Sequence, residues 1–176
     1  MKTHIVFATL LVIVAVMVGF VLPGGVAHSM NAPQKFAIRT SNGHYLTAVG
    51  GGGRTTDVIH TDATRIGSWE KFTWIDTGVG SPIQYGIQTS NGHYLTAVGG
   101  GGRITDVMHS DATKIQGWET FQVDALGGGV YAIKTVNGHY LTALGGGGHS
   151  TDLADDLHSD ATQVRSWEQF RLIPIH

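Results

Sequence analysis

The chain has 176 residues and a formal net charge of −2, and only 14% of its residues are charged. This composition excludes a basic surface for nucleic acid and a polybasic patch for anionic lipid. Because the chain contains no cysteine, disulfides, thiolate zinc sites and cysteine nucleophiles are excluded as well. A chain of this length predicts a single domain.

The first element in chain order is an apolar run from Ile5 to Leu22, which follows Lys2. Pro23-Gly24-Gly25 ends this run, and Ala27-His28-Ser29 supplies small residues at a signal-peptidase site. We therefore predict that residues 1–29 form a signal peptide, cleaved after Ser29, and that the mature chain is secreted. A retained membrane anchor is the alternative, because 18 residues just span a bilayer. Only this segment would then contact the membrane.

Residues 30–176 contain three near-identical repeats. They span about residues 35–80, 84–127 and 130–176. The tryptophan of each repeat recurs every 49 residues, and the third repeat carries an insertion near Leu153. Within a repeat, turn signals alternate with short β-forming runs, and Asn42-Gly43 is a strong hairpin turn. The pattern predicts four strands per repeat and about twelve in all.

Three such units need a closed arrangement that hides their sheet edges. A propeller usually needs four or more blades, and a solenoid needs atypical end repeats, whereas these copies are almost identical. We therefore predict an all-β fold, a pseudo-threefold β-trefoil. The predicted core consists of positions that are apolar in every copy: Ile38, Ile87, Ile133, Leu46, Leu95, Leu141, Ile59, Met108, Leu157, Phe72, Phe121 and Phe170. The small Ala48, Ala97 and Ala143 mark places where the packing is tight.

The motifs NGHYLTA and WEKF, present with small changes in all three repeats, resemble the fascin-like β-trefoil repeat. The resemblance covers essentially all of residues 30–176 and implies a β-trefoil. The ricin-type trefoil is a weaker match, because its Q-x-W signature is missing. Fascins bundle actin, which implies a protein partner. Secreted single trefoils similar to this chain are more often glycan-binding or adhesive, which implies a carbohydrate ligand.

Each repeat also has a run of four glycines, Gly50 to Gly53 in the first copy. A phosphate-binding loop needs a Lys-Ser/Thr pair and a following helix, but Arg54 and Thr55 follow Gly53 and no helix is predicted. We interpret the run as a loop between the second and third strands, with positive φ at some glycines. A loop that also lets a ligand approach the backbone closely is the alternative.

The residues behind the glycine run supply the first candidate site. Strand parity turns Ile59 toward the core and turns His60 and Asp62 outward, where they bind either ligand hydroxyls or only their own loop. Asp57 falls on the opposite strand face, so a metal site is not predicted. The position before Ile59, which holds Val58, Val107 or Asp156, is expected on the surface.

The Asn-Gly turn supplies the second candidate site. His44 and Tyr45 follow it, and an aromatic face beside amide and acidic groups suits a sugar ring. Packing of the tyrosine over the barrel rim is the alternative. The complete set of predicted ligand-binding residues is Asn42, His44, Tyr45, Asp57, His60, Asp62, Asn91, His93, Tyr94, Asp106, His109, Asp111, Asn137, His139, Tyr140, His158 and Asp160.

Catalysis finds little support in the sequence. No G-x-S-x-G motif occurs, and threefold repetition should place Glu70, Glu119 and Glu168 far apart, whereas paired glycosidase carboxyls lie about 5–10 Å apart. The tryptophans are expected to cover the barrel end. The sequence therefore predicts a secreted, non-enzymatic module without cofactor that binds a glycan or polysaccharide at up to three equivalent sites. A fascin-like protein-interaction module, with actin or another protein as partner, is the alternative.

Overall fold

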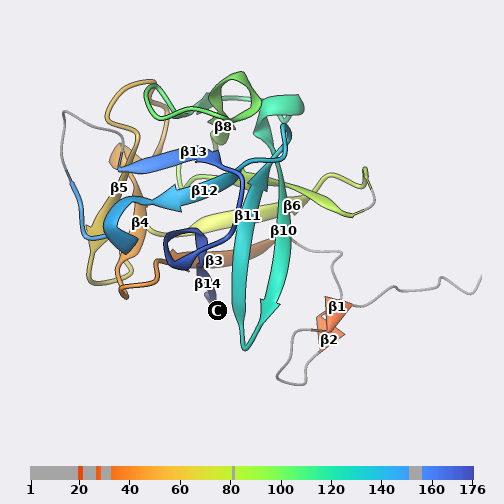
Figure 1. Cartoon of the computed structure of the whole chain (residues 1–176). Helices are drawn as coiled ribbons and strands as arrows, with labels where there is room; N and C mark the ends of the chain where they lie inside the picture. Colours follow the sequence, from red (N-terminus) through yellow and green to blue (C-terminus); the bar gives the residue numbers. More distant parts are fainter. Residues whose placement is uncertain (1–19, 22–26, 29–32, 81, 151–155) are drawn as a thin grey trace, which may run out of the picture.

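The computed structural model describes residues 20–21, 27–28, 33–80, 82–150 and 156–176 (Figure 1). The predicted signal peptide and the insertion near Leu153 lie outside these residues, apart from a short antiparallel pair, β1 (Phe20–Val21) and β2 (Ala27–His28). The helical segments in the described part of the chain are three-residue 3₁₀ turns, and none has the length to cross a bilayer.

Each repeat contributes four strands, interrupted by 3₁₀ turns. The first repeat holds β3 (Gln34–Arg39), β4 (Tyr45–Ala48), η1 (Val49–Gly51), β5 (Ile59–Ala63) and β6 (Phe72–Asp76). The second holds β7 (Gln84–Gln88), β8 (Tyr94–Ala97), η2 (Val98–Gly100), β9 (Met108–Ala112), η3 (Gly117–Glu119) and β10 (Thr120–Gly127). The third holds β11 (Val130–Thr135), β12 (Tyr140–Ala143), η4 (Leu144–Gly146), β13 (Leu157–Ala161), η5 (Ser166–Glu168) and β14 (Arg171–Pro174). One 12-stranded sheet confirms the predicted strand number.

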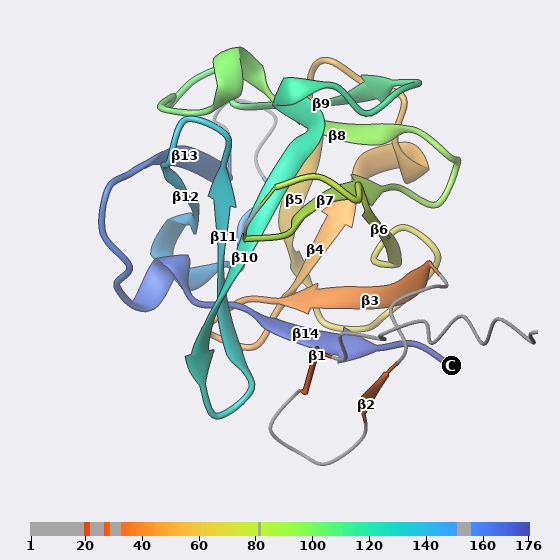
Figure 2. The same ribbon diagram turned by 90° about the vertical axis from the view of Figure 1, so that its right-hand side faces the viewer.

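The first and last strand of each repeat form a closed barrel. β6 pairs with β3 and β7, and β10 pairs with β7 and β11, always antiparallel. β14 pairs with β3, and the two strands run side by side in Figure 2. The ring closes between Tyr131 and Phe170, whose backbones exchange two N–H···O bonds of 2.8 Å. Closure leaves no free sheet edge along the barrel.

The second and third strands of each repeat form a hairpin that covers the barrel. These hairpins are β4–β5, β8–β9 and β12–β13, and two of them lie to the left of the long strands β10 and β11 in Figure 1. Their registers are equivalent: Thr47 faces His60, Thr96 faces His109 and Thr142 faces His158. The three hairpins therefore present equivalent residues at three places around the barrel axis.

The core lies where the barrel meets the three hairpins. All twelve residues predicted from the repeat pattern belong to it, and the three alanines are buried too. Phe72, Phe121 and Phe170 are the largest of the fully buried side chains. Burying one such side chain contributes about 1.5–3 kcal/mol. The prediction was correct because equivalent positions of the three repeats meet around one axis.

The position before the third strand was predicted wrongly. Val58, Val107 and Asp156 are buried, although strand parity put them on the surface. The strands β5, β9 and β13 begin one residue later, so the alternation of a strand does not extend to these positions. At Val58 and Val107 the carbonyl accepts a bond from the 3₁₀ turn, at 3.0 Å from Val49 N and Val98 N.

The glycine run of each repeat packs on the Asn-Gly turn of the next repeat, and we call this contact a seam. A Cβ on Gly52 would stand 2.3 Å from Thr89 Oγ1 of the second repeat. The last seam closes the ring, since a Cβ on Gly147 of the third repeat would stand 2.5 Å from Thr40 Oγ1 of the first. All twelve glycines of the three runs have positive φ. The close approach and the backbone conformation both require glycine here.

Backbone hydrogen bonds hold each seam together. Gly53 N–H donates to Ser110 O at 2.7 Å, and Ser110 N–H donates to Arg54 O at 2.8 Å. The same exchange joins the third repeat to the first through Thr61 and His149. The interpretation of the run as a strand connection is thus confirmed, and the run also joins one repeat to the next.

Candidate functional site

The asparagine of the Asn-Gly turn is committed to the seam. Asn42 Nδ2 donates to the carbonyl of Gly147, and Asn91 Nδ2 donates to that of Gly52 at 2.8 Å. The Oδ1 atoms of both asparagines bond to the Nδ1 of His44 and His93, at 2.9 and 3.0 Å. These predicted ligand residues therefore hold neighbouring repeats together, and each histidine keeps Nε2 for other partners.

The third copy of this turn is arranged differently. Asn137 Nδ2 reaches the carbonyl of Gly99 at 2.9 Å instead of the carbonyl of Gly101. As a result, His139 Nδ1 and Thr135 Oγ1 are buried without a hydrogen-bond partner among the described residues. The three Asn-His pairs are thus not equivalent, although their sequences are.

The tyrosines next to these histidines have neighbours on their rings. The Arg39 guanidinium lies 5.8 Å from the ring centre of Tyr45, and the Lys134 ammonium lies 5.0 Å from that of Tyr140. Tyr140 also donates its hydroxyl to Asp124 at 3.1 Å. In the second copy the residue opposite Tyr94 is the uncharged Gln88. A cation on a ring takes the surface that a sugar would stack on, so only Tyr94 lacks that competitor.

Behind the glycine run, three side chains form a compact cluster in the first two repeats. Asp57 accepts from Arg54 Nη2 at 3.1 Å and bonds to His60 Nε2 at 2.5 Å. Its counterpart Asp106 binds Arg103 at 3.2 Å and His109 at 2.7 Å. In the third repeat His149 replaces the arginine. The three groups satisfy one another, which suits a fixed feature of the fold as well as a binding site.

The partner of His60 differs from the one that strand parity indicates. Asp57 lies before the strand with φ at 51°, and this left-handed conformation turns its carboxylate toward His60. Asp62 and Asp111 are exposed and make no hydrogen bond or ion pair in the described structure. In the third repeat the expected pair is present but loose, with His158 Nδ1 3.9 Å from Asp160 Oδ1. The described residues contain no group of three His, Asp or Glu arranged to hold a metal ion.

The tryptophans are the residues whose exposure the sequence analysis missed. Trp69, Trp118 and Trp167 are 47%, 51% and 46% exposed. The indole of Trp69 lies beside the seam, because a Cβ on Gly51 would stand 3.4 Å from its Cδ1. Each therefore presents much of an aromatic face to solvent, at three equivalent places. The W-E-x-F motif contains one signal for this arrangement: its phenylalanine, Phe72, is the aromatic residue that enters the core, while its tryptophan, Trp69, stays half-exposed.

A buried glutamate holds the turn that carries each tryptophan. Glu70 accepts the Thr47 hydroxyl at 2.7 Å and the Gly67 N–H at 2.7 Å. Glu119 and Glu168 make the same two bonds in the other repeats. Bonds to a buried carboxylate are strong, so the turn is fixed before any ligand arrives. All three glutamates are committed to these contacts.

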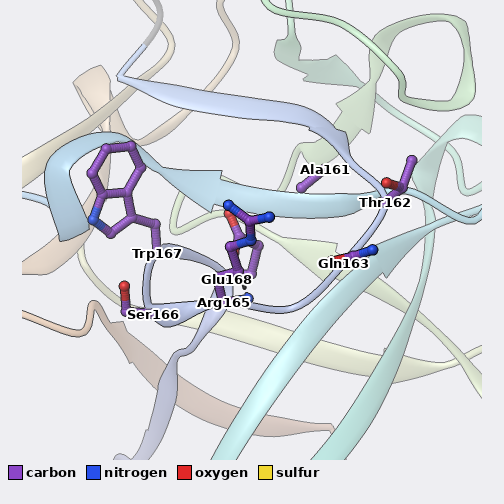
Figure 3. A pocket seen from close by; sticks show the side chains of 7 residues that line it. All are labelled: Ala161, Thr162, Gln163, Arg165, Ser166, Trp167 and Glu168. Carbon is purple, nitrogen blue, oxygen red and sulfur yellow. Dashed lines mark hydrogen bonds between the residues drawn. The ribbon is translucent and has the colours of Figure 1, made fainter.

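An open cleft of about 450 Å³ lies next to the third tryptophan (Figure 3). Its lining consists of Ala161, Thr162, Gln163, Arg165, Ser166, Trp167 and Glu168. In the view of Figure 3, the Arg165 guanidinium lies between the indole of Trp167 and the polar groups of Thr162 and Gln163. The volume lies in the range of small-ligand pockets, and an aromatic face with hydroxyl, amide and guanidinium groups is a lining that binds polar ring compounds.

The barrel and its three hairpins define this chain as a β-trefoil. It is similar to the designed threefold-symmetric protein ThreeFoil, with a TM-score of 0.67 and 12% identity over 80% of this chain and 99% of that chain. It is also similar to the Rhizoctonia solani agglutinin, with a TM-score of 0.62 and 16% identity over 82% of this chain and 96% of that chain. A third similar structure is SeviL bound to asialo-GM1 saccharide, with a TM-score of 0.58 and 15% identity over 82% of this chain and 100% of that chain. No family model and no curated protein matches the sequence.

Proposed function

We propose that this protein is a secreted, non-catalytic carbohydrate-binding module with three related binding surfaces. The observation that carries the proposal is the set of three half-exposed tryptophans at equivalent positions around the barrel. A single exposed apolar side chain is ordinary on a protein surface, but here the same aromatic side chain is half-exposed at all three equivalent positions. The apolar face of a sugar ring packs on an indole, and neighbouring polar groups take its hydroxyls.

The similarity to an agglutinin and to a lectin structure with bound saccharide supports this class of ligand. The resemblance to the fascin-like repeat is kept as part of the proposal, since NGHYLTA and W-E-x-F recur in all three repeats. Three surfaces on one small domain would bind a repeating polymer more tightly than any one of them alone, because the second contact becomes intramolecular.

Retention on immobilised plant, fungal and microbial polysaccharides tests the proposal. The variants are Trp69→Ala, Trp118→Ala and Trp167→Ala, singly and combined. We expect each single change to weaken retention and the triple change to abolish it, because truncating an aromatic anchor of a binding surface typically costs more than about 1 kcal/mol. Val79→Ala, at an exposed apolar residue outside the tryptophan turns, should bind as the original protein does.

Two outcomes would contradict the proposal. One is the absence of retention on every polysaccharide, and the other is a triple variant that binds normally. Binding of actin or another protein by the triple variant would instead favour the protein-interaction alternative. Export is tested on the same protein expressed with its N-terminal segment, and the chain recovered from the medium should begin at Met30.

A further inference from the structure

The third tryptophan turn, which borders the cleft, differs from the other two at the residue two positions before the tryptophan. This position holds Gly67 in the first repeat, Gln116 in the second and Arg165 in the third. The first two repeats carry their basic residues two positions earlier, at Arg65 and Lys114. Only the third repeat therefore places a guanidinium this close to its indole along the chain, and Arg165 lines the cleft together with Trp167.

The guanidinium of Arg165 has no partner of its own. Within the described residues it makes no hydrogen bond or ion pair, and the residue is exposed. Arg54 and Arg103, by contrast, are each bound to an aspartate at 3.1 and 3.2 Å. A planar guanidinium binds carboxylate and sulfate groups through two parallel hydrogen bonds, which makes a free one beside an aromatic face an anion-binding group.

The acidic group in the cleft does not compete for this arginine. Glu168 is buried, its Oε1 accepts the Thr142 hydroxyl at 2.8 Å, and its Oε2 accepts the backbone N–H of Arg165 at 2.7 Å. The carboxylate is thus directed into the protein and positions the backbone of Arg165. The opposite wall offers the amide of Gln163 and the hydroxyl of Thr162, which suit the hydroxyls of a sugar.

We propose that the third cleft binds an acidic sugar, with the ring on Trp167 and its carboxylate or sulfate on the Arg165 guanidinium. This inference rests on the proposed carbohydrate-binding function and assigns the ligand class of one of its three surfaces. The first two tryptophan turns have glycine or glutamine at this position, so we expect them to bind neutral sugars. One domain then recognises a polymer that carries both kinds of unit.

The test measures binding to four immobilised polymers by biolayer interferometry: polygalacturonate, its methyl ester, dextran sulfate and dextran. The methyl ester keeps the sugar backbone and removes the charge. We expect Arg165→Gln, which copies the second repeat, to lower affinity for the acidic polymers at least about tenfold, the size expected for a charge-assisted hydrogen bond. Binding to the uncharged polymers should stay unchanged, whereas Trp167→Ala should weaken both.

Two further variants separate a specific site from general charge attraction. Lys35→Gln removes one positive charge at an exposed position of β3 and should leave binding to acidic polymers within about twofold of the original, because long-range attraction between exposed charges is screened. Gln116→Arg places the guanidinium beside Trp118 and should raise affinity for acidic polymers. Selective loss on polygalacturonate or on dextran sulfate identifies carboxylate or sulfate as the preferred group.

The proposal is overturned if Arg165→Gln loses no more affinity than Lys35→Gln, or if the original protein binds neither polygalacturonate nor dextran sulfate more tightly than the matching uncharged polymer. Binding of dextran or the methyl ester with no preference for acidic polymers would overturn this inference alone. Absence of binding to all four polymers and to the wider polysaccharide set would overturn the proposed function with it.

Discussion

At the scale of single residues, Gly52 carries two structural demands at once. Its backbone lies at φ 106° and ψ −173°, a conformation open essentially only to glycine. A side chain here would also collide with Thr89, whose Oγ1 would stand 2.3 Å from the added Cβ. The residue thus connects the local shape of a loop with the contact between two repeats.

We predict that Gly52→Ala lowers the free energy of unfolding by about 3 kcal/mol or more, because backbone strain and overpacking each cost about 1–3 kcal/mol. Gly78→Ala is the matched control. It also has positive φ, at 66°, but nothing lies within 4 Å of the added Cβ, so only about 1–2 kcal/mol of strain applies. Urea denaturation of both variants measures the difference, and equal losses would rule out a steric role for the seam.

Asp57 shows what strand parity leaves out at this scale. The alternation of β5 correctly buries Ile59 and turns His60 outward. It fails for Asp57, because this residue precedes the strand and adopts positive φ at 51°. A single left-handed residue redirects the carboxylate to His60, and no periodicity in the sequence encodes that turn.

At the scale of elements, strand β7 places Tyr85 opposite Asp76 of the neighbouring strand β6. Tyr85 also packs edge-on against Trp74, with ring centres 6.0 Å apart. Burial, with a smaller contribution from the Asp76 charge, raises the pKa of the Tyr85 hydroxyl above its usual value of 10.0. The folded protein therefore favours the neutral tyrosine.

This shift predicts an alkaline loss of stability. Because the folded pKa is raised, the contribution of Tyr85 is complete below pH 10.0, the unfolded value, and is lost as the pH rises through the folded pKa. Tyr85→Phe cannot ionise, so its melting temperature should fall less between pH 9 and pH 11 than that of the original protein. Each protein is compared with its own value at pH 7, and parallel curves would contradict the assignment.

The hairpins were predictable at this scale because Asn-Gly turns and short β-forming runs are local signals. The burial of Val58 and Val107 was not predictable, because these residues lie between a 3₁₀ turn and a strand, where neither the helical period nor the strand alternation applies. The sequence analysis expected the tryptophans to cover the barrel end, and their exposure was not predictable from a local pattern either. Their exposure depends on where the Glu70 contact holds the turn, which is a tertiary interaction.

At the scale of the whole molecule, β14 and β3 pair as β6 does with β7 and β10 with β11, but no loop joins them. The start of the first repeat meets the end of the third there, since Ile175 N–H donates to Lys35 O at 2.9 Å. The third barrel hairpin is therefore complete except for its covalent connection. The seam between the last and the first repeat has the same close approach of glycine to threonine as the two seams within the chain.

We predict that a circularly permuted chain folds, with a short glycine-rich linker from His176 to Pro33 and new ends between Gly78 and Val79. Both new ends are exposed and lie in the β6–β7 loop, where chain breaks are tolerated. Circular dichroism should show one cooperative transition, lowered by only a few degrees. A control opened between Thr47 and Ala48 breaks β4 inside the core and should not fold, and similar behaviour of both chains would contradict the closed-ring account.

The sequence by itself determined the threefold repeat, the strand number, the β-trefoil and the core, because repetition forces equivalent apolar positions to meet around one axis. Only the tertiary structure decided which polar residues remain free for a ligand. The asparagines, Asp57 and the glutamates are committed to contacts within or between repeats, while Trp167 and Arg165 remain open beside one cleft. The reason is physical: a pattern along the chain records which residues alternate, but hydrogen bonds across a seam depend on three-dimensional proximity.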